Sequence, residues 1–355
     1  MMRAKPTLAY VIEPRFSGGT SAAVAAELRV AAGLARVAVH AISTRMFKGN
    51  DPAPVLADAL DDLGLGLTWD SPVIGADLVV LHNPSFLRFQ NRLDSRIVCR
   101  DLVVVTHENF LRPGDARAFD VLACLEHIRH ASLSARKWLA PVSAANRVTV
   151  QRWLDGQDGT RGWQMLAEDW FNICDFAAAP SPNQPPPPAD RRGRLSRPGP
   201  EKFPALADLD LCFPPHAAAN VILGADRLIA AGIERRHWAM HPFGSLPVAD
   251  FFGMIDFMVY FTAPTWRESF GRVLAEAMGA GKVVLTDAAT AAPFGDGVLA
   301  CTPAEVDQVI SHYLARPDVY TAQVRRGQAR LAAFSGAAFA EQLATLLHGW
   351  QERAA

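Results

Sequence analysis

The sequence has few lysines, almost no net charge and no long apolar run. Lysine occurs only at positions 5, 48, 137, 202 and 282, and the formal net charge of the 355 residues is −1. This balance argues against a nucleic-acid partner, because a broad electrostatic contact with nucleic acid needs a clustered basic face. No apolar stretch approaches the length of a transmembrane span. The apolar run in the segment from Met1 to Ile12 is too short for a signal peptide, and the segment lacks a small-residue cleavage site.

The five cysteines predict neither a disulfide framework nor a metal site. They are odd in number, widely spaced and mostly flanked by apolar residues, and no Cys-x-x-Cys spacing occurs. This pattern is typical of buried thiols in a reducing compartment, so we expect a cytoplasmic protein. The first predicted strand-to-helix loop contains no Gly-x-Gly-x-x-Gly, which weakens a dinucleotide-binding interpretation.

What the sequence does contain is an alternation of short apolar runs with amphipathic helical patterns. Such an alternation predicts parallel sheets covered by helices, and 355 residues are enough for two domains. The predicted strands cover residues 8–12, 37–42, 76–82, 97–98, 102–106, 138–142, 211–213, 219–223, 238–241, 255–261, 283–285 and 298–301.

The plainest boundary is the proline-rich run at 177–189, since proline removes hydrogen-bond donors and stiffens the chain. We predict a Rossmann-like domain at 1–176, a hinge at 177–190 and a second Rossmann-like domain at 191–334. The last helix, in 335–355, is expected to pack back toward the first domain.

The stretch from Ala263 to Asp287 organises the second half of the chain. A buried strand ends at Pro264, Ser269 is a candidate N-cap for a helix, and Gly279 and Gly281 stop that helix before the next strand. A loop that joins a parallel strand to a helix places free N–H groups and the helix dipole at the ligand-binding edge of the sheet, where they favour a phosphate.

Two glutamates in this stretch, Glu268 and Glu276, have seven residues between them. Within one helix they would lie about 12 Å apart along the axis, roughly enough to bracket a diphosphate. Glu268 is better placed in the loop before the helix. Taken alone, the pair is most simply read as a first-turn partner of the helix dipole and a solvated helix residue.

The complete sequence of residues 268–284 changes that interpretation. Glu-Ser-Phe-Gly at 268–271, Leu-Ala-Glu-Ala-Met at 274–278 and Gly-Lys-Val-Val at 281–284 closely resemble the Glu-x7-Glu segment of the retaining GT-B-fold glycosyltransferases of family 4. The resemblance implies two facing doubly wound Rossmann-like domains with an interdomain cleft. It also implies that Glu268 contacts the donor sugar, that Glu276 contacts the nucleotide ribose, and that Ser269, Phe270 and Gly271 bind the donor.

Other parts of the chain resemble the same family in outline. Gly18 and Gly19 stand where these enzymes carry a Gly-Gly loop that faces the diphosphate and the acceptor, although alone they are equally compatible with a tight turn. His107, at the end of a predicted strand, matches a histidine near the donor hexose; without the resemblance it would be a hydrogen-bonding residue at a strand end.

The basic run at 191–204 resembles the Arg…Lys segment that opens the second domain and binds the donor diphosphate. Spacing favours Arg197 and Lys202, with Arg194 as the alternative arginine. Asp208 and Asp210 form an Asp-x-Asp spacing, which holds a metal in the other large transferase fold. We discount it here, because such short acidic matches arise readily by chance.

The resemblance implies a transferase that moves a sugar from a nucleotide-diphosphate sugar to a glycan, lipid-linked or small-molecule acceptor. No metal and no further cofactor are expected, and polysaccharide biosynthesis is the implied setting. Arginines scattered over 112–152 leave peripheral membrane association at the inner face open, but the absence of an opposing apolar stripe favours solvated helix faces. The alternatives are a GT-B epimerase or phosphorylase and a non-catalytic sugar-nucleotide-binding subunit.

Overall fold

The computed structural model describes residues 5–16, 18–157, 162–176 and 187–352, with side chains described as far as residue 347. The chain divides into two compact units. Unit 1 runs to Ile173 and resumes at Phe334, and unit 2 comprises Cys174 to Ala333. This division falls three residues before the end of the predicted first domain. The predicted hinge lies outside the described residues over 177–186.

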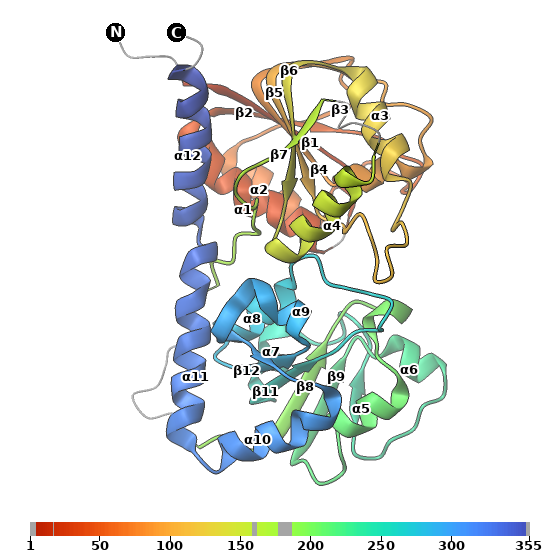
Figure 1. The fold of residues 1–355 in the computed structure, drawn as a ribbon, viewed down its shortest axis with the longest axis vertical. Helices are drawn as coiled ribbons and strands as arrows, with labels where there is room; N and C mark the ends of the chain where they lie inside the picture. Colours follow the sequence, from red (N-terminus) through yellow and green to blue (C-terminus); the bar gives the residue numbers. More distant parts are fainter. Residues whose placement is uncertain (1–4, 17, 158–161, 177–186, 353–355) are drawn as a thin grey trace. The chain divides into compact units, whose positions relative to one another are not determined.

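Unit 1 is built on a sheet of seven strands in the order β3-β2-β1-β4-β5-β6-β7, with parallel pairing throughout (Figure 1). Its strands are β1 (Thr7–Ile12), β2 (Arg36–Ala41), β3 (Leu67–Trp69), β4 (Val73–His82), β5 (Arg96–Thr106), β6 (Ser132–Pro141) and β7 (Trp163–Met165). The chain runs outward from β1 in one direction and from β4 in the other. The topological switch point of this sheet therefore lies between β1 and β4.

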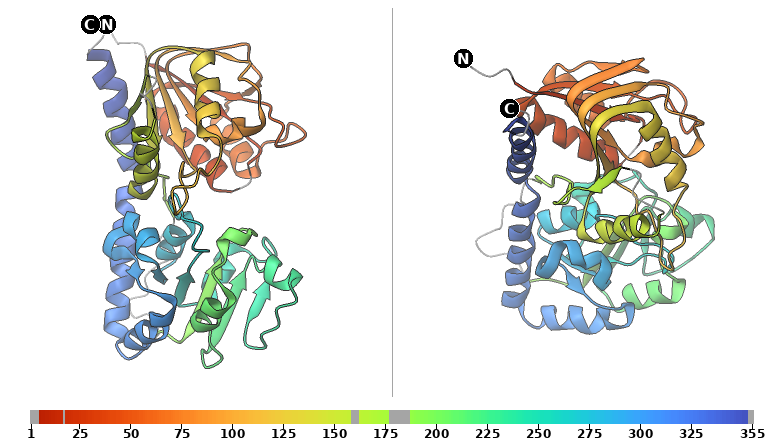
Figure 2. Two further views of the ribbon diagram at one scale, coloured as in Figure 1. Left: turned by 45° about the vertical axis from the view of Figure 1, so that its right-hand side comes forward. Right: turned by 45° about the horizontal axis from the view of Figure 1, so that its top comes forward.

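The helices of unit 1 are α1 (Gly19–Leu34), α2 (Pro54–Leu63), η1 (Pro84–Phe89), α3 (Val121–Ala131), α4 (Ala144–Asp155) and α12 (Gly336–Glu352). Because parallel crossovers are right-handed, α1 and α2 lie on one face of the sheet and α3 and α4 on the other (Figure 2). The C-terminal helix α12 packs against α1. Its Phe339 ring meets Trp170 edge to face, with the ring centroids 5.3 Å apart.

Unit 2 contains a second parallel sheet, of six strands in the order β10-β9-β8-β11-β12-β13. Its strands are β8 (Arg191–Leu195), β9 (Ala219–Leu223), β10 (Ala239–His241), β11 (Phe257–Tyr260), β12 (Val283–Thr286) and β13 (Leu299–Ala300). Here the switch point lies between β8 and β11. The central strand β11 is buried along its whole length, as its continuous apolar sequence predicts.

The helices of unit 2 are η2 (Pro200–Lys202), α5 (Leu206–Cys212), α6 (Asp226–Ala230), α7 (Val248–Gly253), α8 (Arg272–Gly279), α9 (Ala288–Ala291), η3 (Ala292–Gly297), η4 (Pro303–Glu305), α10 (Val306–Leu314), α11 (Pro317–Arg330) and η5 (Leu331–Phe334, its last residue in unit 1). Apolar side chains from β9, β11 and β12 and from α5, α6, α10 and α11 form a hydrophobic core of this unit. Thr302 and Glu305 form the capping box expected from the helix-start pattern at 302–305.

The α/β fold class with two parallel sheets is confirmed, but two local predictions are wrong and strand β8 was missed. Residues 211–213 are not a strand, because Leu206–Cys212 forms α5 with Leu209 and Cys212 buried on one side. Strand β8 was not predicted, because three of its five residues are arginines. The helix after Glu268 begins at Arg272, and its N-cap is Gly271 rather than Ser269. No helix in the described ranges is long and apolar enough to cross a membrane.

Candidate functional site

The switch point of unit 2 brings together the two segments that carry most of the predicted site residues. The chain leaves β8 at Leu195 and the neighbouring β11 at Tyr260, so both following segments begin at the same edge of the sheet. They are joined directly, since the Ala263 N–H donates to the Glu201 carbonyl over 3.1 Å. Parallel sheets bind ligands at this position, outside the carboxyl ends of strands at a switch point.

Lys202 and Glu268 form an ion pair at this edge. The Lys202 ammonium lies 2.5 Å from Glu268 Oε1, and the side chains are only 10% and 13% exposed. The Tyr260 hydroxyl donates to the same carboxylate oxygen over 2.7 Å. Burial works to raise the pKa of Glu268, but the Lys202 charge and the hydrogen bonds from Lys202 and Tyr260 outweigh it and lower the pKa. The result is an ionised carboxylate and an ammonium group held side by side.

Arg194 and Arg197, the two candidate diphosphate ligands, lie in different environments. The Arg194 side chain is fully buried and donates to the backbone carbonyls of Lys202 and Phe261. Its guanidinium carbon lies 4.4 Å from the Phe203 ring centroid and 5.0 Å from that of Tyr260. Arg194 thus ties the two segments of the switch point together, and its complete burial leaves no exposed face of the guanidinium for a ligand.

Arg197 is accessible. Its side chain is 55% exposed and pairs with Glu201 over 2.9 Å. A surface pair of this kind contributes little free energy and is readily exchanged for a different anion. Of the two arginines, Arg197 is the one that a ligand can reach.

Gly271 and α8 complete this edge. Gly271 has φ 86°, a left-handed conformation that favours glycine, and it turns the chain into α8. The preceding Phe270 is buried against Phe294, with ring centroids 5.5 Å apart. Because the left-handed conformation of Gly271 cannot lie within a right-handed helix, α8 begins after it and not at Ser269. The helix dipole favours an anion at the amino end of α8.

Glu276 lies in α8, while Glu268 lies in the loop before it. Glu276 pairs with Arg272 one turn earlier over 3.1 Å, and its side chain is 27% exposed. Burial raises the pKa of Glu276, against the opposing effect of Arg272. Because only one glutamate is helical, the axial spacing of about 12 Å does not apply to the pair.

Asp208 and Asp210, the discounted acidic pair, lie on α5. Asp210 forms an ion pair with Arg235, whose Nε lies 2.8 Å from its Oδ1. No group of three or more side chains that could hold a metal ion occurs among the residues that the structure describes.

In unit 1, Gly18 and Gly19 stand at the switch point between β1 and β4. Gly18 is the N-cap of α1 with φ 117°, and Gly19 is the first helical residue; both are exposed. A side chain at Gly18 would be strained by this backbone conformation, although the surrounding space is open. The exposed amino end of α1 is therefore available to an anion.

His107 directly follows β5, at the same edge of the unit 1 sheet. Its Nε2 lies 2.9 Å from Nδ1 of His82, the last residue of β4. Burial, followed by the neighbouring His82, lowers the pKa of His107 well below its ordinary value, so its imidazole is neutral. His82 and Glu27, which lies behind it on α1, were not singled out from the sequence.

The carboxylates near the unit 1 edge are already paired. Glu13 is buried and bound by Arg15 over 2.7 Å. Glu108 accepts from Arg88 over 2.7 Å and from Ser85 over 2.7 Å. These contacts engage both groups within unit 1.

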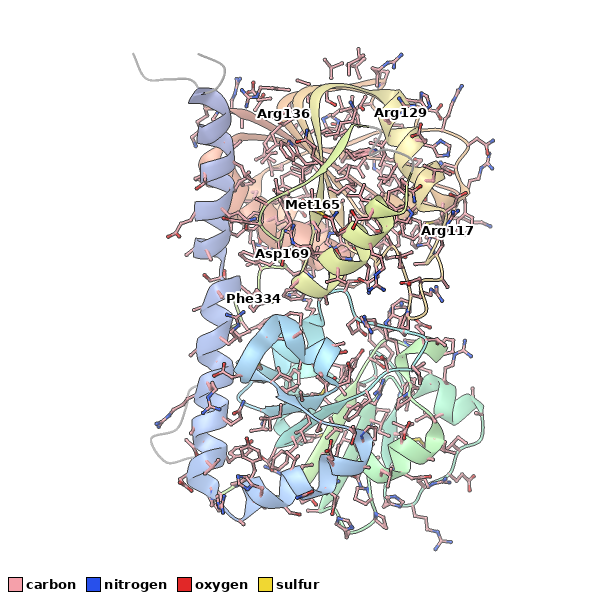
Figure 3. All side chains as sticks on the ribbon, viewed as in Figure 1. Arg117, Arg129, Arg136, Met165, Asp169 and Phe334 are labelled. Atoms are coloured by element: carbon pink, nitrogen blue, oxygen red, sulfur yellow. The ribbon has the colours of Figure 1, made fainter. Side chains whose placement is uncertain are left out.

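Most arginines of the 112–152 stretch also have acidic partners. Arg129 on α3 pairs with Glu126, and Arg136 on β6 pairs with Asp101; both arginines are labelled in Figure 3. Arg147 pairs with Asp169 over 2.6 Å. These pairs do not form a continuous basic face.

Comparison with solved structures identifies the architecture. Anabaena HepE in complex with UDP and glucose matches with a TM-score of 0.67 and 14% identity, covering 97% of this chain and 100% of that one. The chain has the GT-B fold. A sucrose-phosphate synthase from Thermosynechococcus elongatus matches with a TM-score of 0.62 and 13% identity, over 98% and 100% of the two chains. An E. coli trehalose-6-phosphate protein bound with UDP-2-fluoro glucose matches with a TM-score of 0.61 and 12% identity, over 96% and 98%.

No protein-family model matches the sequence, and no curated protein matches it. At these identities the structural likeness establishes the fold alone.

Proposed function

We propose that this GT-B chain is a retaining glycosyltransferase that moves a sugar from a nucleotide-diphosphate sugar to a glycan, lipid-linked or small-molecule acceptor. The observation that carries the proposal is the Lys202–Glu268 pair at the β8/β11 switch point, beside the amino end of α8. An ammonium suits a diphosphate, and an ionised carboxylate suits a sugar that gains positive character. The UDP and UDP-sugar complexes of the structural neighbours favour uridine as the base.

In this proposal the cations stabilise the leaving group. Charge develops on the nucleotide diphosphate as the glycosidic bond breaks, and positioned donors lower the energy of that charge in the transition state. Lys202 and Arg197 supply positive charge, and the amides at 269–271 and the start of α8 supply hydrogen bonds. The diphosphate competes with Glu268 for Lys202 and with Glu201 for Arg197.

Glu268 and His107 are assigned to the sugar, and Glu276 to the ribose. Glu268 is held ionised, so it stabilises an oxocarbenium-like sugar. His107 is neutral, so it offers a hydrogen bond rather than a charge. Gly18 and Gly19 are assigned to the diphosphate and acceptor side. These roles follow the resemblance to family 4, and the geometry within each unit is compatible with them.

We further propose that transfer needs no metal and no cofactor besides the donor. Side-chain cations replace a metal in this arrangement, and Asp210 is engaged by Arg235. Activity should therefore survive a chelator. Loss of activity that manganese restores would instead implicate Asp208 and Asp210.

Retention of the donor's anomeric configuration is assigned to front-face attack. In this mechanism the departing phosphate oxygen takes the proton from the acceptor hydroxyl. Retention otherwise uses a carboxylate nucleophile, as in the two-carboxylate hydrolases. Glu13 and Glu108 are engaged by Arg15 and Arg88 within unit 1, and Glu268, itself paired with Lys202, is the carboxylate that the resemblance assigns to the sugar.

The proposal is tested first by binding. A thermal-shift panel of UDP, GDP, ADP and CDP should select one nucleotide, and the matching nucleotide-sugars should then be assayed for hydrolysis and transfer. Lys202→Ala should lower turnover more than it weakens nucleotide binding. Lys5→Ala changes an exposed lysine of unit 1 and serves as the control.

Arg197→Ala should also lower turnover, while Arg236→Ala, an exposed arginine of unit 2, should not. Nucleotide binding without hydrolysis or transfer would instead favour a non-catalytic binding subunit. Interconversion of donor sugars, or release of sugar phosphate in the presence of inorganic phosphate, would favour the epimerase or phosphorylase alternative.

A further inference from the structure

Two buried polar side chains lie in line behind His107. His82 Nδ1 is 2.9 Å from His107 Nε2, and His82 Nε2 is 3.3 Å from Glu27 Oε2. The side chains of His82 and Glu27 are fully buried. The three side chains come from separate parts of unit 1. Glu27 lies on α1, His82 is the last residue of β4, and His107 follows β5. The fold thus brings three polar residues, distant in sequence, into one row.

Packing alone does not explain a carboxylate and an imidazole at these positions. Glu27 faces the sheet from α1, where the other buried residues are mostly apolar or small, such as Val24, Leu28 and Ala31. A buried ionised group is unfavourable unless it is paired, and a buried ion pair can often be replaced by apolar residues without loss of stability. The pair therefore points to a role in the chemistry of the partly exposed residue at the end of the row, which is His107.

The number of protons in the row determines what His107 can do. The groups that face His82 are Glu27 on α1, His107 after β5, and Tyr10 on β1, whose ring stacks on His82 with centroids 5.6 Å apart. A Glu27–His82 pair with no net charge avoids a lone buried charge. In the ion-paired form of these two side chains both ring nitrogens of His82 carry a hydrogen, with Nε2 3.3 Å from Glu27 Oε2 and Nδ1 2.9 Å from His107 Nε2.

That second hydrogen fixes the tautomer of His107. With a hydrogen on His82 Nδ1, the 2.9 Å contact makes His82 the donor and His107 Nε2 the acceptor. The pKa of His107 is lowered by burial and by His82, and its neutral imidazole carries a single hydrogen. The hydrogen must then be on Nδ1, the nitrogen that His82 does not engage.

We propose that Glu27 and His82 are positioning residues that hold His107 in the tautomer with its hydrogen on Nδ1. His107 then offers a hydrogen-bond donor, not an acceptor, to a hydroxyl oxygen of the transferred sugar. The catalytic part of this inference rests on the proposed function, whereas the tautomer is a property of unit 1 itself.

The tautomer can be measured without any activity. In protein labelled with ¹⁵N-histidine, the imidazole resonances of His107 are assigned by their loss in His107→Phe. The wild type should show a protonated Nδ1 and an unprotonated Nε2. His82→Phe removes the donor to Nε2 and keeps an aromatic ring against Tyr10, and it should convert His107 to the other tautomer or to a mixture. Glu27→Leu, a second variant that removes the carboxylate, should also give a mixture.

The kinetic measurement distinguishes a role in positioning His107 from a role in the stability of the fold alone. His82→Phe and Glu27→Leu should lower kcat by about 10- to 100-fold, as for outer partners that orient a functional histidine, with little change in the donor KM. His40→Phe is the matched control, because His40 is a strand histidine of unit 1 that bonds Ser71 outside the row. It should change neither the His107 resonances nor kcat.

The NMR and kinetic results distinguish failure of the tautomer inference from failure of the proposed function. A wild-type His107 with its hydrogen on Nε2 overturns the inference whatever the activity. An unchanged kcat in folded His82→Phe and Glu27→Leu variants, with the tautomer altered, overturns its catalytic part. A wild-type protein that neither hydrolyses nor transfers any nucleotide-sugar overturns the proposed function and the catalytic part with it, while the NMR measurement still decides the tautomer.

Discussion

Replacing Lys202 by methionine should destabilise unit 2 through the carboxylate that it leaves behind. Methionine keeps much of the side-chain volume but removes the ammonium that lies 2.5 Å from Glu268. Breaking a buried ion pair by removing one partner costs about 3–5 kcal/mol. The two side chains are 10% and 13% exposed, and Tyr260 still donates to Glu268, so we expect a loss of about 2–4 kcal/mol in the free energy of unfolding at pH 7.

The pH dependence of this loss identifies its cause. In the wild type the folded pKa of Glu268 is lowered, so its contribution to stability is present above the unfolded pKa of about 4.3 and is lost as the pH falls through the folded pKa. Without Lys202 burial dominates, and the folded pKa of Glu268 should rise above the unfolded value. The variant's penalty is then full at neutral pH and is relieved as the pH falls through that raised pKa. The stability difference should therefore shrink toward pH 4.

The measurement is calorimetric or denaturant unfolding of both proteins between pH 8 and pH 4. A difference of 1 kcal/mol corresponds to about 2–4 °C in Tm for a domain the size of unit 2. Lys202→Met combined with Glu268→Gln is the control, because removing both charges avoids the lone buried carboxylate and should recover most of the loss. Equal stability of wild type and Lys202→Met at pH 7, or a difference that does not change with pH, would refute the reasoning.

Three further predictions concern the assigned site residues, two glycines of unit 2 and the stereochemistry of the product. Glu276→Ala should mainly raise the donor KM, because ribose contacts act in ground and transition states alike, whereas Glu268→Ala should mainly lower kcat; identical effects would contradict the assigned roles. Gly224→Ala should reduce the free energy of unfolding by about 2–4 kcal/mol, because its φ is 88° and a Cβ would lie 1.8 Å from the Ser196 carbonyl oxygen; Gly232→Ala, at φ 66° in open space, should cost about 1 kcal/mol, and equal losses in denaturant unfolding would remove the steric explanation. NMR of the product from an α-linked donor should show an α linkage, and a β linkage would overturn the retaining mechanism.

The fold was predictable because its strands and helices carry local signals. The apolar runs that became β1, β4, β5, β9, β11 and β12 were identified from composition and length, and the turn residues between them marked the helix ends. Strand β8 gave no such signal. Its charges are compensated by residues far along the chain, since Arg191 pairs with Asp256 and Arg192 pairs with Asp307 as well as with the nearby Asp190. A short-range reading of the sequence therefore sees a basic linker where the fold has a buried strand.

The same contrast explains α5. Leu211, Cys212 and Phe213 are compatible with a strand when read alone, yet Leu209, Cys212 and Phe213 are buried at helical spacing. Asp208 in the first turn complements the helix dipole. The helical period over seven residues outweighs the strand propensity of the last three, which a three-residue window cannot reveal.

The candidate site was predictable where loops carry it and not where buried partners support it. Lys202 ends the short η2 turn after β8, and Glu268 lies in the loop after β11; binding residues occur disproportionately in such connections. Arg194 looks as suitable as Arg197 in the sequence, and only the aromatic rings and carbonyls around its guanidinium exclude it as a ligand. Glu27 carries a weak signal that could have been used, because a carboxylate among the alanines and leucines on the inner face of α1 violates the apolar pattern. Such a violation points to a buried polar partner, and only the folded sheet shows that this partner is His82, and that His107 lies next to it.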